Sequence, residues 1–158
     1  MRKAFAKNLL SIMAQNEAIV LITADMGYGL WDNVRDTYPE RFFNVGSAEQ
    51  LMIGAATGMA LEGRIPICYS ISSFLLYRPF EFIRNYMHFE KTPIKLVGGG
   101  RNKDYGYLGY THWAEEDITV MSTLSNIVLF KPTDEDQMNH LMHHFLNNGL
   151  PSYMNLSK

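Results

Sequence analysis

The stretch Ala18–Ala24, AIVLITA, is the first of a series of short apolar runs that together indicate the fold. Its residues are apolar with little alternation, as expected for a strand that is covered on both faces. Five later runs have the same character and are also predicted to be strands: Phe42–Val45, Ile65–Ile71, Pro93–Gly98, Asn126–Phe130 and Ser152–Leu156.

Helical patterns separate these runs. The N-terminal segment repeats apolar residues at helical spacing, and Ala48–Leu61 is rich in Ala, Met and Leu and stops before Gly63, a typical residue after a helix end. Three further helices are predicted: Pro79 to about Phe89, Glu115–Leu124, and Thr133–Asn147 with Thr133 as its N-cap. The alternation of helix and strand predicts an α/β fold, a three-layer parallel sheet with helices on both faces.

Composition limits the class of protein. The 158 residues include 14 basic and 16 acidic side chains, a net charge of −2, which argues against nucleic acid or an anionic membrane as the main partner. No apolar run approaches the roughly 18 residues that a membrane span needs. The single cysteine, Cys68, excludes an intramolecular disulfide and suits a reducing compartment, so we expect one cytoplasmic domain, residues 1–158.

Ligands of parallel α/β sheets bind beyond the carboxyl ends of the strands. We expect loops there at Asp25–Trp31, Gly46–Glu49, Ser72–Arg78 and Gly98–Trp113. Glu49 begins an otherwise apolar helix. Its carboxylate either complements the helix dipole or lies in a poorly solvated site where it shares a proton with a ligand nitrogen.

The Gly98–Trp113 loop is long, rich in glycine and rich in aromatic residues, which is typical of a functional loop. Its three consecutive glycines are a weak signal for phosphate binding. His112 at its end has either a structural role or a role in substrate binding and proton transfer. The three histidines within Thr133–Asn147 are predicted to form a solvated helix face, and we predict no metal ligands in this chain.

Several short segments occur in an informative order. They are Thr23-Ala24-Asp25, Asn44-Val45-Gly46, Ala48-Glu49-Gln50, Ser73-Phe74 before Arg78, and Gly109-Tyr110-Thr111-His112 before Glu116-Asp117. In this order they resemble the pyrimidine-binding domain of transketolases and deoxyxylulose phosphate synthases, and the resemblance covers nearly the whole chain. It implies the thiamine diphosphate-binding fold of the pyrimidine-binding type and a thiamine diphosphate-dependent transferase.

The resemblance also implies roles for particular residues. Glu49 is expected to hydrogen-bond the ring nitrogen of the aminopyrimidine and so set the tautomer of its amino group. Phe74 is expected to stack on that ring, with Tyr77 extending the platform, and Asp25 to support the site. His112 is expected to contact substrate oxygens and to assist proton transfer.

The family holds diphosphate and a divalent metal with a Gly-Asp-Gly segment on another domain, and nothing in this sequence resembles that segment or the third transketolase domain. The resemblance therefore implies a small subunit of a split enzyme. Its partner would carry the diphosphate-binding domain with Mg²⁺ or another divalent cation. The expected assembly is a heterotetramer with two copies of each chain and with the cofactor at the interface.

The substrate side departs from the family pattern. Leu108 occupies the place of an acid that reads a donor hydroxyl, and glycine near Gly99–Gly100 replaces a histidine that reads phosphate. Arg2 and Arg101 are candidates to supply positive charge to a substrate. Transfer of a two-carbon ketol or acyl unit between sugars or related carbonyl compounds is the leading hypothesis. The alternatives are a subunit of a 2-oxo acid decarboxylase or acyloin-forming enzyme, and a non-catalytic structural subunit.

Overall fold

The computed structural model describes residues 1–158 and contains one six-stranded sheet. All the strand pairs are parallel, and the order across the sheet is β2-β1-β3-β4-β6-β5. The strands are β1 (Ile19–Thr23), β2 (Phe42–Asn44), β3 (Ile65–Ile71), β4 (Lys95–Gly99), β5 (Val128–Phe130) and β6 (Ser152–Leu156). Each falls within one of the predicted apolar runs or differs from it by a residue, so the predicted parallel α/β fold is confirmed.

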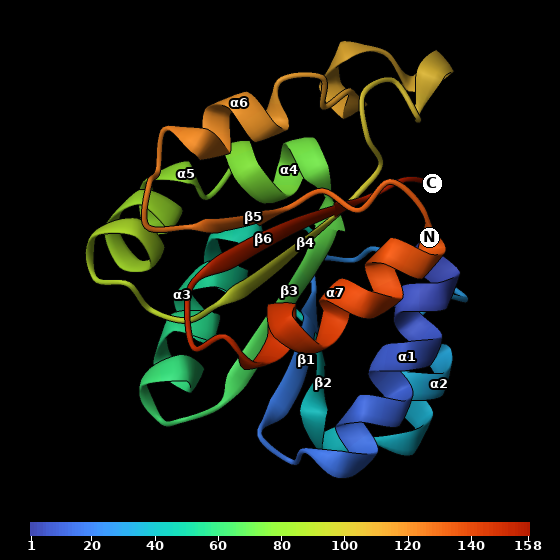
Figure 1. Cartoon of the computed structure of the whole chain (residues 1–158), viewed down its shortest axis with the longest axis vertical. Coiled ribbons are helices and arrows are strands. Elements are labelled where there is room, and N and C mark those ends of the chain that lie inside the picture. Colours follow the sequence, from blue (N-terminus) through green and yellow to red (C-terminus); the bar gives the residue numbers. More distant parts are fainter.

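Helices cover both faces of this sheet (Figure 1). On one face lie α1 (Arg2–Gln15), α2 (Asp32–Thr37) and α7 (Glu135–Asn147). On the other lie α3 (Glu49–Leu61), α4 (Ser72–Tyr77), α5 (Phe80–Phe82), the π-helical turn η2 (Ile83–Phe89) and α6 (Asp117–Ser122). Three short 3₁₀ turns complete the chain: η1 (Pro39–Arg41), η3 (Gly106–Leu108) and η4 (Tyr110–His112).

Two apolar cores result because successive strand residues point to opposite faces. Leu21, Tyr69 and Val97 pack toward α1 and α7, whereas Ile22 and Cys68 pack toward α3 and α4. Most of the methionines fill these cores: Met13, Met52, Met87, Met121, Met138, Met142 and Met154 are buried. Seven of the ten methionines therefore belong to the core. No helix of the chain is long and apolar enough to cross a membrane.

The expected loop at Ser72–Arg78 is wrong, because α4 begins directly after β3. The helix starts with two serines whose side chains bind the segment after β4. In the structure the Ser72 hydroxyl donates to the Gly100 carbonyl and the Ser73 hydroxyl donates to the Thr111 carbonyl. These bonds tie α4 to the segment after β4 and leave the backbone free to form a helix.

The predicted N-cap of α7 is also displaced by one residue. The cap is Asp134, whose side chain accepts a hydrogen bond from the Gln137 amide at 2.8 Å. Thr133 instead binds the Gln137 side chain through its own amide and hydroxyl. Thr133 and Asp134 therefore both bind Gln137 in the first turn of α7. The cap is Asp134, because its backbone is extended, as is typical of an N-cap residue.

The three glycines after Lys95-Leu96-Val97 are not a phosphate cradle. Gly98 and Gly99 are buried in β4, where a Cβ would lie 2.5 Å from the Ser72 hydroxyl or 2.6 Å from the Tyr69 hydroxyl. Gly100 has φ +91° and faces the Tyr105 ring. These residues are glycines because other side chains already fill the space that a Cβ would need.

Candidate functional site

Glu49 is the first residue of α3 and is only 1% exposed. Both of its carboxylate oxygens have a partner. The Ser70 hydroxyl, from the end of β3, donates to Oε1 at 2.9 Å, and Nη1 of Arg78 donates to Oε2 at 2.8 Å. The carboxylate is thus poorly solvated. This is the environment expected if Glu49 shares a proton with a ligand nitrogen, the second of the two interpretations of the sequence.

Phe74 and Arg78 lie four positions apart on α4 and its C-cap, so their side chains share a helix face. The Arg78 guanidinium carbon is 3.9 Å from the centroid of the Phe74 ring. Through the same guanidinium, the aromatic ring is linked to the carboxylate of Glu49. Three elements thus meet here: the start of α3, the end of β3 and α4.

His112 approaches Phe74 from the long segment after β4. The two rings are 4.9 Å apart at an interplanar angle of 66°, and Tyr105 lies 6.0 Å from the histidine ring on another side. Nδ1 of His112 is 2.9 Å from the Thr111 hydroxyl. His112 is half-buried, so its ring both contacts the aromatic cluster and reaches solvent.

An open cleft of about 560 Å³ adjoins these residues. Tyr77 lies in it, and its hydroxyl donates to Oε1 of Glu116 at 2.8 Å. Partial burial, together with the hydrogen bond to the Glu116 carboxylate and its negative charge, raises the pKa of Tyr77 above its usual value. The lining residues are Ser73, Phe74, Tyr77, Arg78, Tyr110, Thr111, Glu116 and Val120.

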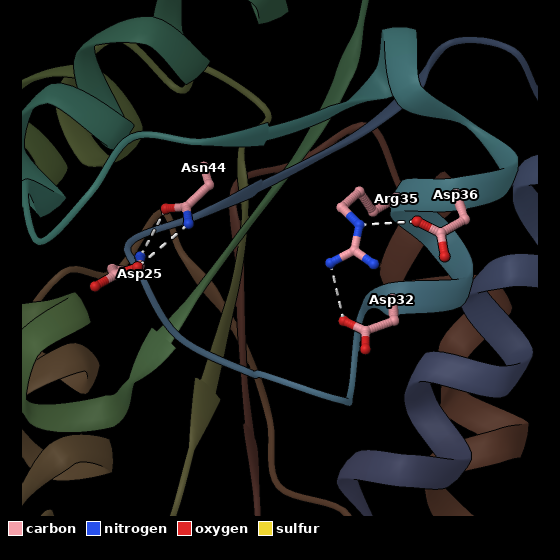
Figure 2. A network of polar contacts seen from close by, with 5 residues as sticks. All are labelled: Asp25, Asp32, Arg35, Asp36 and Asn44. Carbon is pink, nitrogen blue, oxygen red and sulfur yellow. Dashed lines mark hydrogen bonds and ion pairs between the residues drawn. The ribbon is translucent and has the colours of Figure 1, made fainter.

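Asp25 lies at the end of β1, beside the end of β2 (Figure 2). Its amide donates to Oδ1 of Asn44 at 2.9 Å, and the Tyr28 hydroxyl donates to its Oδ1 at 2.7 Å. The bonds from Tyr28 and Asn44 lower the pKa of Asp25. Its φ of 55° shows that the chain turns sharply here. The structure places Asp25 at the same sheet edge as Glu49 but gives no direct contact between them.

The two candidate substrate arginines do not line the cleft beside Phe74. Arg2 donates to the Tyr105 hydroxyl at 3.3 Å and lines a separate cleft between α1 and the segment after β1. Arg101 donates to the Asn155 carbonyl at 2.6 Å, and its buried Nε has no partner. Arg2 is nevertheless connected to His112, because both contact Tyr105.

A buried polar network supports the segment that carries His112. Asp117, at the start of α6, accepts from the Tyr153 hydroxyl at 2.7 Å and from the side-chain Nδ2 of Asn155 at 2.9 Å. Burial together with the Asp117 charge raises the pKa of Tyr153. This network fixes α6 to β6, and hence fixes the position at which the long segment returns to the fold.

Sequence reasoning did not single out Ser70, Arg78, Glu116 or Asp117 for these roles. Arg78 could have been found, since a helix at Ser72–Tyr77 makes Phe74 and Arg78 neighbours on one face. The others come from strands and helices whose spatial order the sequence does not specify.

The residues present fit the aminopyrimidine half of thiamine diphosphate. An aminopyrimidine ring binds to an aromatic face by stacking and to a buried carboxylate through its protonated ring nitrogen. Phe74 and Glu49 supply these two groups. No group of three or more His, Cys, Asp or Glu side chains is arranged to hold a metal ion.

Comparisons with known proteins identify relatives of this chain. A protein described as a transketolase C-terminal section, from Methanocaldococcus jannaschii, is 37% identical over 135 residues, which are 85% of this chain and 43% of that protein. A 1-deoxy-D-xylulose-5-phosphate synthase from Dehalococcoides mccartyi is 35% identical over 151 residues, which are 94% of this chain and 23% of that protein. The chain therefore spans less than half the length of these curated relatives.

A solved split-gene transketolase, an inactive β4 tetramer, superimposes with a TM-score of 0.86 at 30% identity. It covers 99% of this chain, which in turn covers 50% of that one. The family model described as "Transketolase, pyrimidine binding domain" matches residues 1–158. From its sequence, its fold and these matches, the chain belongs to the family of transketolase pyrimidine-binding domains.

Proposed function

We propose that this chain is the pyrimidine-binding subunit of a split, thiamine diphosphate-dependent transketolase-like enzyme. The observation that carries the proposal is the buried carboxylate of Glu49, which Arg78 links to the Phe74 ring, with His112 packed against that ring. The split arrangement is supported by the likeness to a split-gene transketolase and to a transketolase C-terminal section. The enzyme transfers a two-carbon ketol or acyl unit between sugars or related carbonyl compounds.

Each side chain has a defined task in this proposal. Glu49 accepts a hydrogen bond from the protonated ring nitrogen, and its burial keeps water from competing for that bond. Phe74 stacks on the ring, which contributes about 0.5–1.5 kcal/mol beyond area burial. Tyr77 and Asp25 border the site. When bound, the cofactor supplies a nucleophilic carbon that stores the electrons of the bond being broken.

His112 is proposed to act on the substrate. Its half-exposed ring packs against Phe74, a residue that lines the cleft, and there it can donate a hydrogen bond to a substrate oxygen or carry its proton. The Thr111 hydroxyl beside Nδ1 orients the ring. The hydrogen bonds that Asp117 makes to β6 hold this segment in place from behind.

A partner subunit completes the site in this proposal. It holds the diphosphate and a divalent cation such as Mg²⁺, while this chain holds the pyrimidine end, and the expected complex is a heterotetramer. Leu108 favours a second candidate reaction, decarboxylation of a 2-oxo acid or acyloin formation, because an apolar residue stands where a sugar-reading acid is expected.

The test measures thiamine diphosphate binding with Mg²⁺ to the chain alone and to the chain mixed with a partner that carries a Gly-Asp-Gly segment. We expect tight binding only in the mixture. Glu49→Gln should lower turnover by about a hundredfold or more. Glu62→Gln, at the exposed other end of α3, is the matched control and should leave turnover unchanged.

Near-normal turnover of a folded Glu49→Gln complex would refute the proposed role of this residue. Assays with ketose donors and with 2-oxo acids then separate the two reactions. Release of carbon dioxide without ketose turnover selects the decarboxylase. Full activity of the partner without this chain would indicate a structural subunit instead.

A further inference from the structure

The guanidinium of Arg78 touches both residues that the proposed function assigns to the aminopyrimidine ring. Its carbon lies 3.9 Å from the Phe74 centroid, and its Nη1 donates to Oε2 of Glu49 at 2.8 Å. A single planar group thus stacks on the aromatic face and binds the buried carboxylate at the same time.

The guanidinium also resembles the ring chemically. It is a flat N–C–N cation that donates hydrogen bonds in its own plane. An aminopyrimidine protonated on its ring nitrogen presents a similar flat N–C–N edge with a shared positive charge. A carboxylate beside an aromatic face therefore binds either group through the same kinds of contact.

We propose that Arg78 occupies the place of the aminopyrimidine ring in the free chain, and that the ring displaces this guanidinium when it binds. The inference rests on the proposed function. It explains how Glu49, at 1% exposure, has a positive partner before any ligand arrives.

The two residues of the ion pair differ in their freedom to move. The Glu49 side chain is enclosed, and Ser70 holds its other oxygen. The Arg78 side chain is 45% exposed and leaves α4 at its C-terminal end, so it can rotate into solvent without unfolding the helix. The exchange therefore removes one cation from Glu49 as another arrives, and the carboxylate is never left alone.

Competition from Arg78 weakens ring binding. Arg78→Met removes the charge and the plane but keeps an unbranched side chain, so we expect it to bind the ring about tenfold more tightly than the unchanged chain. Arg78→Lys keeps the positive charge but not the planar group, so its affinity for the ring should lie between that of the unchanged chain and that of Arg78→Met. Arg84→Met is the matched control, since Arg84 is exposed and donates only to its neighbour Asn85.

The experiment uses the full chain and 4-amino-5-hydroxymethyl-2-methylpyrimidine as the probe, with affinities measured by NMR titration. The Arg78 Nε–Hε resonance is followed in the same samples and should move toward the position of free arginine as the probe binds. Tighter binding by Arg78→Met, with no change for Arg84→Met, supports the inference.

Two results would overturn it in different ways. Probe binding that needs Glu49 but is equal or weaker in Arg78→Met, or that leaves the Arg78 resonance unmoved, rejects the displacement and leaves the proposed function standing. Failure of both the unchanged chain and Arg78→Met to bind the probe, each tested alone and in the complex with the diphosphate-binding partner, rejects the pyrimidine site itself, and with it the displacement.

Discussion

Glu49 and Lys95 are charged side chains that are each 1% exposed. Glu49 lies beyond the carboxyl ends of the strands, whereas Lys95 lies at the amino end of β4. Glu49 faces the cation of Arg78, whereas Lys95 has only neutral partners. Its Nζ donates to Oδ1 of Asn148 at 2.5 Å and to the Leu150 carbonyl at 2.6 Å. An ammonium without a carboxylate partner is costly to bury, and this burial lowers the pKa of Lys95 from its usual 10.5 to about 8.

Lys95 therefore makes stability depend on pH. Between about pH 8 and pH 10.5 the unfolded chain keeps a proton on this lysine that the folded chain has released. The free energy of unfolding should accordingly rise with pH across this window. The measurement is urea denaturation of the unchanged chain and of Lys95→Met at several pH values. The free energy of unfolding of the unchanged chain should rise relative to that of Lys95→Met as the pH increases from about 8 to 10.5.

The tyrosines titrate in a similar pH range and also affect the free energy of unfolding. Their contribution cancels in the difference between the unchanged chain and the variant. Lys131→Met, a substitution of an exposed lysine, should show no such change in the difference. A pH-independent difference between the unchanged chain and Lys95→Met would mean that Lys95 titrates alike in both states.

At the scale of the elements, α4 is positioned by its contact with β4. Gly98 lets the Ser72 hydroxyl and the Tyr153 hydroxyl approach β4, since a Cβ there would lie 2.5 Å and 2.8 Å from these oxygens. Ser72 begins the helix that carries Phe74. The glycine in the strand thus decides how close the proposed ring-binding face lies to the sheet.

Gly98→Ala should therefore lower the free energy of unfolding by about 1–3 kcal/mol, because the added methyl forces these elements apart. Gly58→Ala is the matched control on α3. Gly58 is exposed and a Cβ would meet nothing within 4 Å, so this change should raise stability by about 0.5–1 kcal/mol. Urea denaturation measures both, and equal effects of the two substitutions would contradict this account of the α4 contact.

At the scale of the whole molecule, exposed aromatic residues gather where the site lies. Tyr77, Tyr107 and Tyr110 are 40%, 90% and 75% exposed and belong to α4 and the segment after β4. Both elements follow the carboxyl ends of strands, so these side chains share the edge of the sheet that carries Glu49. Exposed aromatic side chains in such a place are typical of a protein interface.

Hydrogen exchange tests whether this face binds the proposed partner. With a diphosphate-binding partner and the cofactor added, we expect slower amide exchange in Ser72–Arg78 and in Tyr105–His112. Residues around Leu61, Phe89 and Leu150 are exposed at the opposite edge of the sheet and serve as the internal control. Slower exchange confined to that opposite edge would place the partner away from the proposed site.

The strands were predictable because each is covered on both faces and is therefore a continuous apolar run. The end of α3 was predictable as well, since Gly63 has the positive φ that a residue after a helix end often needs. The helix α4 was not, because its serines find their hydrogen-bond partners in a segment 28 and 38 residues away. Local signals cannot show that such partners exist.

The sequence by itself determined the parallel α/β fold, the family and the identity of Glu49, Phe74 and His112 as candidates. These follow from apolar runs and from short motifs in a fixed order, which are properties of neighbouring residues. Tertiary structure decided that Arg78 lies between Glu49 and Phe74, and that Asp117 secures the segment of His112. Those contacts depend on the order of the strands and on the packing of elements that are distant in the sequence. They form through long-range interactions, which a local sequence pattern does not show.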